Sequence, residues 1–273
     1  MKGSQRIHAA FTRAADEGRA AFIAYVLAGH RSAEESAAVA EAALAGGADL
    51  LEIGVPFSDP MADGPVIAEA GRTAVRNGAG LRTARDVVRQ LRAAGREQPL
   101  LLMTYRNPLR VAGEDVLADL SADGVDGLIT PDLPAGEEPS FERAAARAGL
   151  ALSFLVAPNT SDERVEAVIA ASTGFVYVVP RFGVTGSRDA VADGAAELIV
   201  RIRGAARGRA PVAAGFGISR PEHVAALRDA ADGLIVGSLL VGLVNDAPEG
   251  VAPTSVQSAV TALVGATGLG PAA

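Results

Sequence analysis

Short apolar runs recur along the chain, and stretches rich in alanine and charged residues lie between them. The runs contain many β-branched residues, which is typical of strands buried on both faces of a parallel sheet. Eight such runs occupy residues 20–29, 48–56, 99–105, 126–132, 150–158, 174–180, 210–217 and 232–238. The stretches between them have helical spacing. The pattern therefore predicts eight strand–helix units, with a parallel sheet covered by helices.

Two of the intervening stretches carry signals for the ends of a helix. Ser32 opens "SAEESAAVAEAALAGG" and Gly46 closes it, while Ser161 opens "SDERVEAVIAAST". A serine hydroxyl can accept a hydrogen bond from a free N–H of the first helical turn, and glycine commonly ends a helix. We therefore predict helices that begin after Ser32 and Ser161. The polar first nineteen residues predict an extra N-terminal helix.

A closed (β/α)8 barrel fits eight units better than an open doubly wound sheet. The open sheet usually has fewer strands and would need a nucleotide-type glycine loop after its first strand, but no G-x-G-x-x-G follows residues 20–29. We expect one barrel domain over residues 1–273, with a core from about 18 to 265 and a flexible C-terminal tail. In this architecture the active site lies at the carboxyl ends of the strands.

Composition narrows the range of partners. The 273 residues are 49% apolar and 21% charged, with a net charge of -7 and no basic cluster of the kind that follows a phosphate backbone. The chain has no cysteine, and its three histidines are too scattered to suggest a metal site. We find no apolar signal core and no membrane span. We therefore expect a cytoplasmic protein without metal, nucleic-acid or membrane partners.

Two acids stand where the barrel would carry its chemistry. Glu52 interrupts the second apolar run, so it should point into the barrel mouth, where partial desolvation raises its pKa toward values useful for proton transfer. The alternative is a structural glutamate held by an arginine of a neighbouring strand. Asp63 follows in a loop rich in glycine and proline, where an aspartate often only caps a turn.

Three glycine-rich loops form a second candidate site. They are "FGVTGS" (182–187), "GFGIS" (215–219) and "VGSLL" (236–240), after the sixth, seventh and eighth runs. Glycine lets backbone N–H groups approach an anion, and barrels often bind phosphate after strands 7 and 8, so the three loops together favour a phosphate site over plain turns. Residues 181–194 form a long loop that could be either a lid or a passive connector.

These motifs resemble those of the tryptophan synthase alpha subunit family. "LEIGVPFSDPMADGP", "PDLP", "GVTG", "GFGIS" and "VGS" occur in the family's order and at nearly its spacing, and "TYRNP" resembles its Tyr-x-Asn segment. The resemblance covers about residues 5 to 245, and the first motif is long enough to be highly specific. It implies a (β/α)8 barrel that cleaves indole-3-glycerol phosphate to indole and glyceraldehyde 3-phosphate without a cofactor.

The resemblance also implies roles for individual residues. Glu52 matches the catalytic glutamate, which deprotonates the glycerol hydroxyl and relays a proton to indole C3. Asp63 matches the aspartate that accepts a hydrogen bond from the indole N–H. The phosphate-binding positions of the family match Gly186, Gly215, Gly217, Gly237 and Ser238. The positions that line its indole pocket match Tyr25, Met103, Ile129, Tyr177 and Phe216, although all five could be core residues at strand ends, an interpretation that fits Met103 and Ile129 in particular.

The remaining implied features concern closure of the site and the partner subunit. Thr185 matches a lid threonine that bonds the aspartate when the site closes. The resemblance implies a pyridoxal-phosphate beta subunit as partner, in an alpha2beta2 assembly. The barrel face that docks on this subunit would include Pro56, Asp59 and Asn107.

The chain departs from the family pattern at a few positions near these loops. His30 stands where an acid is expected, and Arg106 stands where a neutral residue is common and would be a rim charge beside the partner. Pro180 and Phe182 alter the start of the lid. Three alternatives to an alpha subunit remain open: a free-standing indole-releasing lyase, a non-catalytic activator of a beta subunit that binds the phosphate ligand, and a different phosphate-binding barrel such as a sugar-phosphate isomerase.

Overall fold

The strands of the protein run parallel in a single sheet. The structure, a computed structural model, describes residues 2–179, 188–215, 217–218 and 220–268. Over these residues the strands are β1 (Ala21–Leu27), β2 (Leu50–Gly54), β3 (Leu100–Met103), β4 (Gly127–Ile129), β5 (Ala151–Ser153), β6 (Leu155–Val156), β7 (Val176–Val178), β8 (Val212–Gly215) and β9 (Gly233–Val236). Their order in the sheet is β5-β4-β3-β2-β1-β9-β8-β7-β6.

The two ends of this sheet belong to the same stretch of chain, so the sheet closes into a barrel. β5 pairs with β4, β6 pairs with β7, and only Phe154 separates β5 from β6. The carbonyl oxygen of Phe154 accepts the N–H of Tyr177 at 2.9 Å, which continues the pairing on the β7 side. The run predicted at 150–158 is thus one barrel strand in two parts. Its first part pairs with β4 and its second part pairs with β7. The predicted eight-stranded barrel is confirmed.

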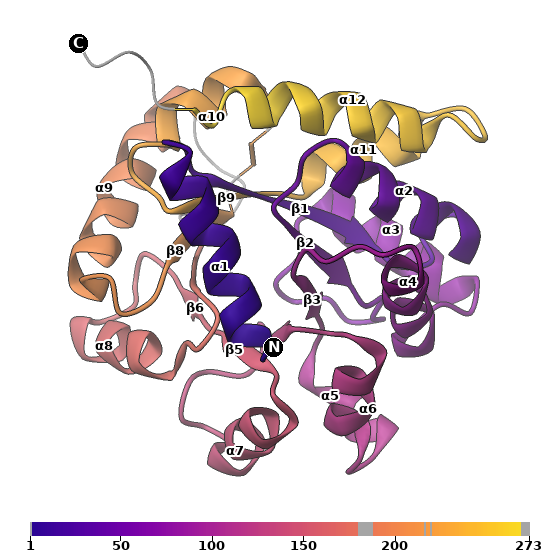
Figure 1. The fold of residues 1–273 in the computed structure, drawn as a ribbon, viewed down its shortest axis with the longest axis horizontal. Helices are drawn as coiled ribbons and strands as arrows, with labels where there is room; N and C mark the ends of the chain where they lie inside the picture. The colour runs from indigo at the N-terminus through magenta and orange to yellow at the C-terminus, as the bar shows by residue number, and fades with distance from the viewer. Residues whose placement is uncertain (1, 180–187, 216, 219, 269–273) are drawn as a thin grey trace.

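Helices surround the barrel, and one crosses its amino-terminal mouth (Figure 1). They are α1 (Gly3–Asp16), α2 (Ala33–Ala45), α3 (Pro65–Arg76), α4 (Leu81–Ala93), α5 (Arg106–Ala112), α6 (Val116–Asp123), α7 (Pro139–Ala148), α8 (Asp162–Ala171), α9 (Arg188–Ala206), α10 (Pro221–Leu227), α11 (Ser238–Asp246) and α12 (Ala252–Gly265). The predicted caps are present, since the hydroxyls of Ser32 and Ser161 accept the N–H groups of Glu35 and Arg164.

Alternate side chains of each strand face two different cores. Phe22, Ala24 and Val26 of β1 pack outward in the large core between sheet and helices. The inner core holds Ala21 and Ile23 of β1, with side chains of other strands. It also holds four buried residues of α1: Ile7, Ala10, Phe11 and Ala14. Helix α1 therefore closes the amino-terminal end of the barrel. Its buried residues belong to the core, although the sequence predicted a core that begins at about residue 18.

Three aspartates tie neighbouring strands together at this amino-terminal rim. We call these residues the rim aspartates. They directly precede β2, β4 and β9 and are Asp49, Asp126 and Asp232. Each accepts the N–H at the start of the preceding barrel strand, with distances of 2.8 Å from Phe22, 2.9 Å from Leu100 and 2.8 Å from Val212. Thr173 takes the same place before β7, because its hydroxyl accepts the N–H of Leu152 at 2.9 Å. The bond therefore recurs at every second strand junction around the barrel.

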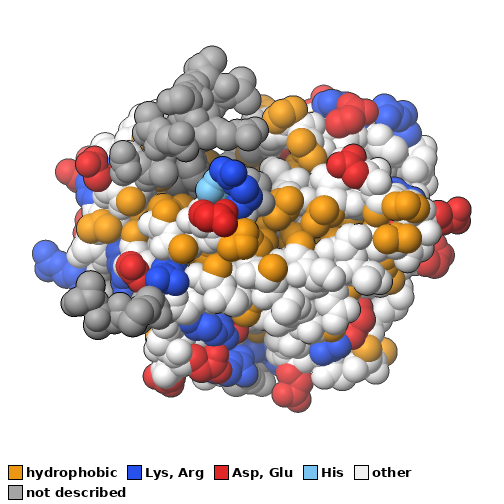
Figure 2. Space-filling model, turned by 90° about the horizontal axis from the view of Figure 1, so that it is seen from above, with side chains coloured by type: hydrophobic (Ala, Val, Ile, Leu, Met, Phe, Trp, Pro, Cys, Tyr) orange, Lys and Arg blue, Asp and Glu red, His pale blue; other side chains and the backbone are white. Residues whose placement is uncertain are grey.

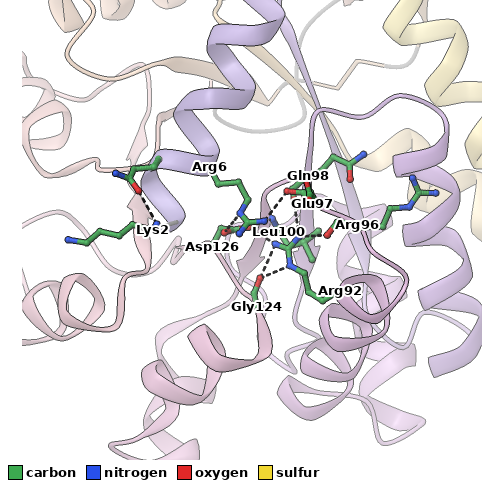
Figure 3. A network of polar contacts seen from close by, with 10 residues as sticks. Lys2, Arg6, Arg92, Arg96, Glu97, Gln98, Leu100, Gly124 and Asp126 are labelled. Atoms are coloured by element: carbon green, nitrogen blue, oxygen red, sulfur yellow. Dashed lines mark hydrogen bonds and ion pairs between the residues drawn. The ribbon is translucent and has the colours of Figure 1, made fainter.

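Each rim aspartate is also paired with arginine, and Asp126 has two such partners (Figure 3). The Arg92 Nη2 atom lies 2.6 Å and the Arg6 Nε atom 3.0 Å from the Asp126 carboxylate. Arg92 further donates to the carbonyl oxygens of Gly124, Arg96 and Gln98. Burial raises the pKa of Asp126 above its usual value, although Arg92, Arg6 and the Leu100 N–H act to lower it. The carboxylate thus depends on its arginines to stay charged.

The face that carries α12 is poor in charge. Helix α12 contains no charged residue and packs on α2 and α11. Figure 2 shows this face, where apolar side chains form a band across the middle of the view, interrupted left of the centre by a small group of charged side chains and a histidine. None of the helices in the described part of the chain combines the length and apolar character needed to span a membrane.

Candidate active site

Glu52 lies inside the barrel, near the carboxyl ends of the strands. It is paired in register with Tyr25 of β1 and Leu101 of β3. Leu50, two residues earlier on the same face of β2, belongs to the inner core. The Glu52 side chain is fully buried, and neither carboxyl oxygen has a hydrogen-bond partner within the described residues. The structural alternative, a glutamate held by a neighbouring arginine, is therefore not realised in that part of the chain.

Burial without a partner determines the ionisation of Glu52. Desolvation, with a smaller contribution from the charge of Asp63, raises the pKa of Glu52 to about 8. At pH 7 the protonated form of this carboxyl group therefore predominates. A group poised in this way can first donate a proton and then, as a carboxylate, accept one.

Asp63 lies in the loop between β2 and α3, close enough to Glu52 for its charge to raise the pKa of that residue. Its side chain is partly exposed, and burial raises its own pKa, whereas a hydrogen bond from the Tyr105 hydroxyl, at 3.3 Å, lowers it. Gly64, not Asp63, caps α3, and no backbone N–H of the described residues donates to Asp63. Among the described residues, Asp63 therefore makes no capping bond to this turn.

Tyr105 was missed as a site residue in the sequence. It follows β3, is 4% exposed, and its hydroxyl oxygen accepts the N–H of Ala62 at 2.9 Å while donating to Asp63. Its ring stacks on Phe57 with the centroids 5.0 Å apart. Tyr105 thus joins the end of β3 to the loop that carries Asp63. Two signals were available: its place in the "TYRNP" segment, and its position two residues past a strand, on the active rim of the barrel.

Two tyrosines of the predicted ring pocket lie over glycines. A Cβ atom at Gly54 would meet the Tyr25 hydroxyl at 2.1 Å, and one at Gly215 would meet the Tyr177 hydroxyl at 2.5 Å. Backbone without side chains is therefore required beside both rings. Of the other predicted pocket residues, Met103 is half-buried and packs against both the inner core and the cluster around Tyr25, Ile129 is fully buried in the inner core, and Phe216 lies outside the described residues.

The predicted phosphate loops follow two adjacent strands at the same level. Gly215 of β8 is in register with Ile235 of β9, so Gly217 and Gly237 each lie two residues beyond a paired position. Gly217 is exposed and has a φ of 43°, a left-handed conformation that favours glycine. Ser238 opens α11, whose first N–H groups have no side-chain cap. Gly186 and Thr185 lie outside the described residues.

The rim around the site carries the residues predicted to face a partner. Asp59 and Asn107 are exposed, but Pro56 is buried. Two large apolar side chains on neighbouring segments, Met61 and Val111, are 81% and 79% exposed. The described part of the chain holds no group of three or more potential metal-ligating side chains.

Two departures from the family pattern are now explained. Arg106 is not an isolated rim charge, because its side chain is only 20% exposed and is paired with Glu138. His30 is buried and shares a hydrogen bond with Asn245 of α11 at 2.8 Å, and burial lowers its pKa. Pro180 and Phe182 lie outside the described residues.

Comparisons with known proteins agree on one family. The family model described as tryptophan synthase alpha chain matches residues 11–265. A tryptophan synthase alpha chain from Halorhodospira halophila is 43% identical over 94% of each chain, and one from Solibacter usitatus is 44% identical over 86% of this chain and 88% of its own. A tryptophan synthase structure from Mycobacterium tuberculosis superposes with a TM-score of 0.87 at 36% identity, covering 97% of this chain and 99% of that one. A tryptophan synthase complex from Pyrococcus furiosus gives 0.81 at 35% identity, covering 91% and 99%.

Proposed function

The chain belongs to the tryptophan synthase alpha chain family, and from that premise we propose that it cleaves indole-3-glycerol phosphate to indole and glyceraldehyde 3-phosphate. Members of the family are lyases of this kind. The observation that carries the proposal for this chain is the buried carboxyl group of Glu52, which lies beside Asp63 and has no hydrogen-bond partner among the residues that the structure describes. A retro-aldol cleavage needs an acid and base at the breaking bond and an anion at the ring nitrogen, and the two residues supply both.

Glu52 would carry both proton transfers. In its protonated form it gives a proton to C3 of the indole ring, which makes the ring a cationic indolenine. The resulting carboxylate then removes the proton of the glycerol hydroxyl. As the new carbonyl forms, the bond between C3 and the glycerol carbon breaks and its electron pair returns to the ring. One proton is given and one is taken, so Glu52 ends as it began.

Asp63 would stabilise the charge that develops at the far end of the ring. A carboxylate that accepts the ring N–H lowers the energy of the indolenine cation more than that of the neutral substrate. The bond from the Tyr105 hydroxyl supports this role, because it lowers the pKa of Asp63 against the effect of burial and so favours the charged form. The tyrosines over Gly54 and Gly215 would bound the ring.

The glycine loops after β8 and β9 would bind the substrate phosphate. Gly217→Asp is expected to weaken the binding of glycerol 3-phosphate at least tenfold, because a carboxylate would stand close to the bound anion and an L side chain is strained at this φ. Isothermal titration of wild type and variant measures the change. No atom lies within 4 Å of a Cβ built at Gly217, so the variant should fold, which circular dichroism checks. An unchanged affinity would remove phosphate binding from this loop.

A beta subunit is the partner that we propose, since related structures are tryptophan synthase complexes. We expect the purified chain alone to release indole slowly, and a beta subunit to accelerate release at least about tenfold, which corresponds to a coupling of about 1.4 kcal/mol. The measurement is indole formed from indole-3-glycerol phosphate, with and without the subunit. No indole in either case would contradict the lyase assignment. Full speed without the subunit would replace the alpha-subunit assignment with a free-standing lyase.

A further inference from the structure

Tyr105 reaches Asp63 from the first residue before α5, so its position depends on how that helix is held. The backbone N–H of Arg106, the first residue of α5, donates to both carboxylate oxygens of Asp132, at 2.9 and 3.1 Å. This bond fixes the backbone immediately after Tyr105. This single bond does not fix the direction of α5, which therefore depends on contacts made by side chains of the helix.

The Arg106 side chain supplies a second attachment, to helix α7. Its Nε and Nη2 atoms lie 3.0 and 2.9 Å from Oε2 of Glu138, the residue that precedes α7. Its guanidinium carbon lies 4.5 Å from the centre of the Phe141 ring, within the range of a cation–π contact. The side chains of Arg106 and Glu138 are 20% and 26% exposed, so the pair is better shielded from water than an ordinary surface ion pair.

The contacts form a continuous path from α7 to the active site. Glu138 and Phe141 hold Arg106, Tyr105 is the residue before Arg106 in the chain, and the Tyr105 hydroxyl donates a hydrogen bond to Asp63 at 3.3 Å. We propose that Arg106 is a positioning residue of the lyase reaction, which acts by keeping Tyr105 in place to hold Asp63 against the ring nitrogen. The inference rests on the proposed function of Asp63.

The pH dependence of cleavage gives a readout specific to this path. The groups whose charges act on Asp63 or respond to it are Glu52 of β2, Tyr25 of β1, Tyr177 of β7 and Tyr105. The Tyr105 bond lowers the pKa of Asp63, so weakening that bond raises it. The acid limb of kcat/KM should then move to higher pH. Loss of stability elsewhere in the barrel would leave that limb in place.

The test compares Arg106→Gln with Arg85→Gln in the full chain. Arg85 is a matched control, because its side chain is 22% exposed and pairs with Asp123. Asp123 ends α6 three residues before the rim aspartate Asp126, at the amino-terminal side of the barrel. We expect Arg106→Gln to lower kcat about fivefold with KM changed less than about twofold, and to shift the acid limb upward. Arg85→Gln should keep both kcat and the pH profile. Glu138→Gln, which leaves the arginine on Phe141, provides a second variant if Arg106→Gln folds poorly, with the same direction of change.

A double-mutant cycle decides whether Arg106 acts through Tyr105. Tyr105→Phe should lower kcat about tenfold, and adding Arg106→Gln to it should lower kcat by less than about a further twofold. Multiplicative effects of the two substitutions, or an Arg106→Gln variant with wild-type kcat and pH profile, would overturn the inference. In either case wild-type cleavage of indole-3-glycerol phosphate shows that the proposed function stands. Absence of cleavage by the wild type would instead count against that function.

Discussion

Glu52→Gln is expected to lower kcat for cleavage of indole-3-glycerol phosphate by about a hundredfold or more. The amide has nearly the shape of the carboxyl group, but it can neither give a proton to the ring nor take one from the hydroxyl. Because the phosphate loops and the ring pocket are unchanged, glycerol 3-phosphate should bind within about twofold of wild type. Indole release and ligand titration measure the two effects separately. Near-normal turnover would end the assignment of Glu52 as the proton carrier.

The same substitution has a stability signature that an inactive misfolded protein would not show. The pKa of Glu52 is raised from 4.5 to about 8 in the folded protein, so the wild type loses stability as the pH rises through this window. Glutamine does not titrate. The variant should match the wild type near pH 4.5 and become more stable above pH 8, by on the order of 4 to 5 kcal/mol at most, since each pH unit contributes about 1.4 kcal/mol. Denaturant unfolding at several pH values tests this expectation, and a difference that does not change with pH would contradict the raised pKa and the buried environment of Glu52.

Asp126→Ala is expected to destabilise the fold by about 3 kcal/mol, the largest stability loss that we predict at pH 7. The substitution removes the acceptor of the Leu100 N–H and the carboxylate that Arg6 and Arg92 share. Arg92 keeps several carbonyl acceptors, which is why we place the loss at the lower end of the range for a broken buried ion pair. Urea unfolding of the full chain gives the value.

Two further variants interpret that loss: one separates the hydrogen bond of Asp126 from its charge, and the other gives the cost of breaking an ordinary surface ion pair. Asp126→Asn keeps an oxygen for the Leu100 N–H and removes only the charge, so it should lose less than the alanine variant. Glu166→Ala breaks an exposed ion pair with Arg209, whose side chains are 55% and 47% exposed, and should cost less than about 1 kcal/mol. Equal losses for Asp126→Ala and Glu166→Ala would show that the rim aspartate is no more than a surface charge.

Period and chemistry along the chain were sufficient to predict the barrel. Eight apolar runs became the eight barrel strands, because strands buried on both faces cannot carry polar residues without a reason. That rule also singled out Glu52, an acid within such a run that the structure buries near the active end of the barrel. Helix starts at Ser32 and Ser161 followed from local hydrogen bonding, which needs no tertiary contact.

Features that depend on residues far apart in the sequence could not be predicted in this way. The bond between Tyr105 and Asp63 joins residues 42 positions apart, and it depends on the path of two loops. The pairing of Arg106 with Glu138 turns an apparent rim charge into an internal contact for the same reason. The interruption of the fifth strand at Phe154 reflects the closure of the barrel, which no single run encodes. Pro56 ends the predicted run 48–56, but β2 stops at Gly54, so the burial of Pro56 depends on the packing of the following loop.

The rim aspartates affect which parts of the protein can vary during evolution. Asp49, directly before β2, fixes the alignment of this strand with β1, and Glu52 of β2 carries the chemistry. The two functions lie three residues, or about 10 Å, apart along the extended chain. Slippage by one residue would turn Glu52 out of the barrel. Because the alignment is set at the end opposite the active loops, those loops can vary in length and sequence while the barrel keeps its register. Mutations in these loops can therefore change substrate preference without loss of the barrel fold.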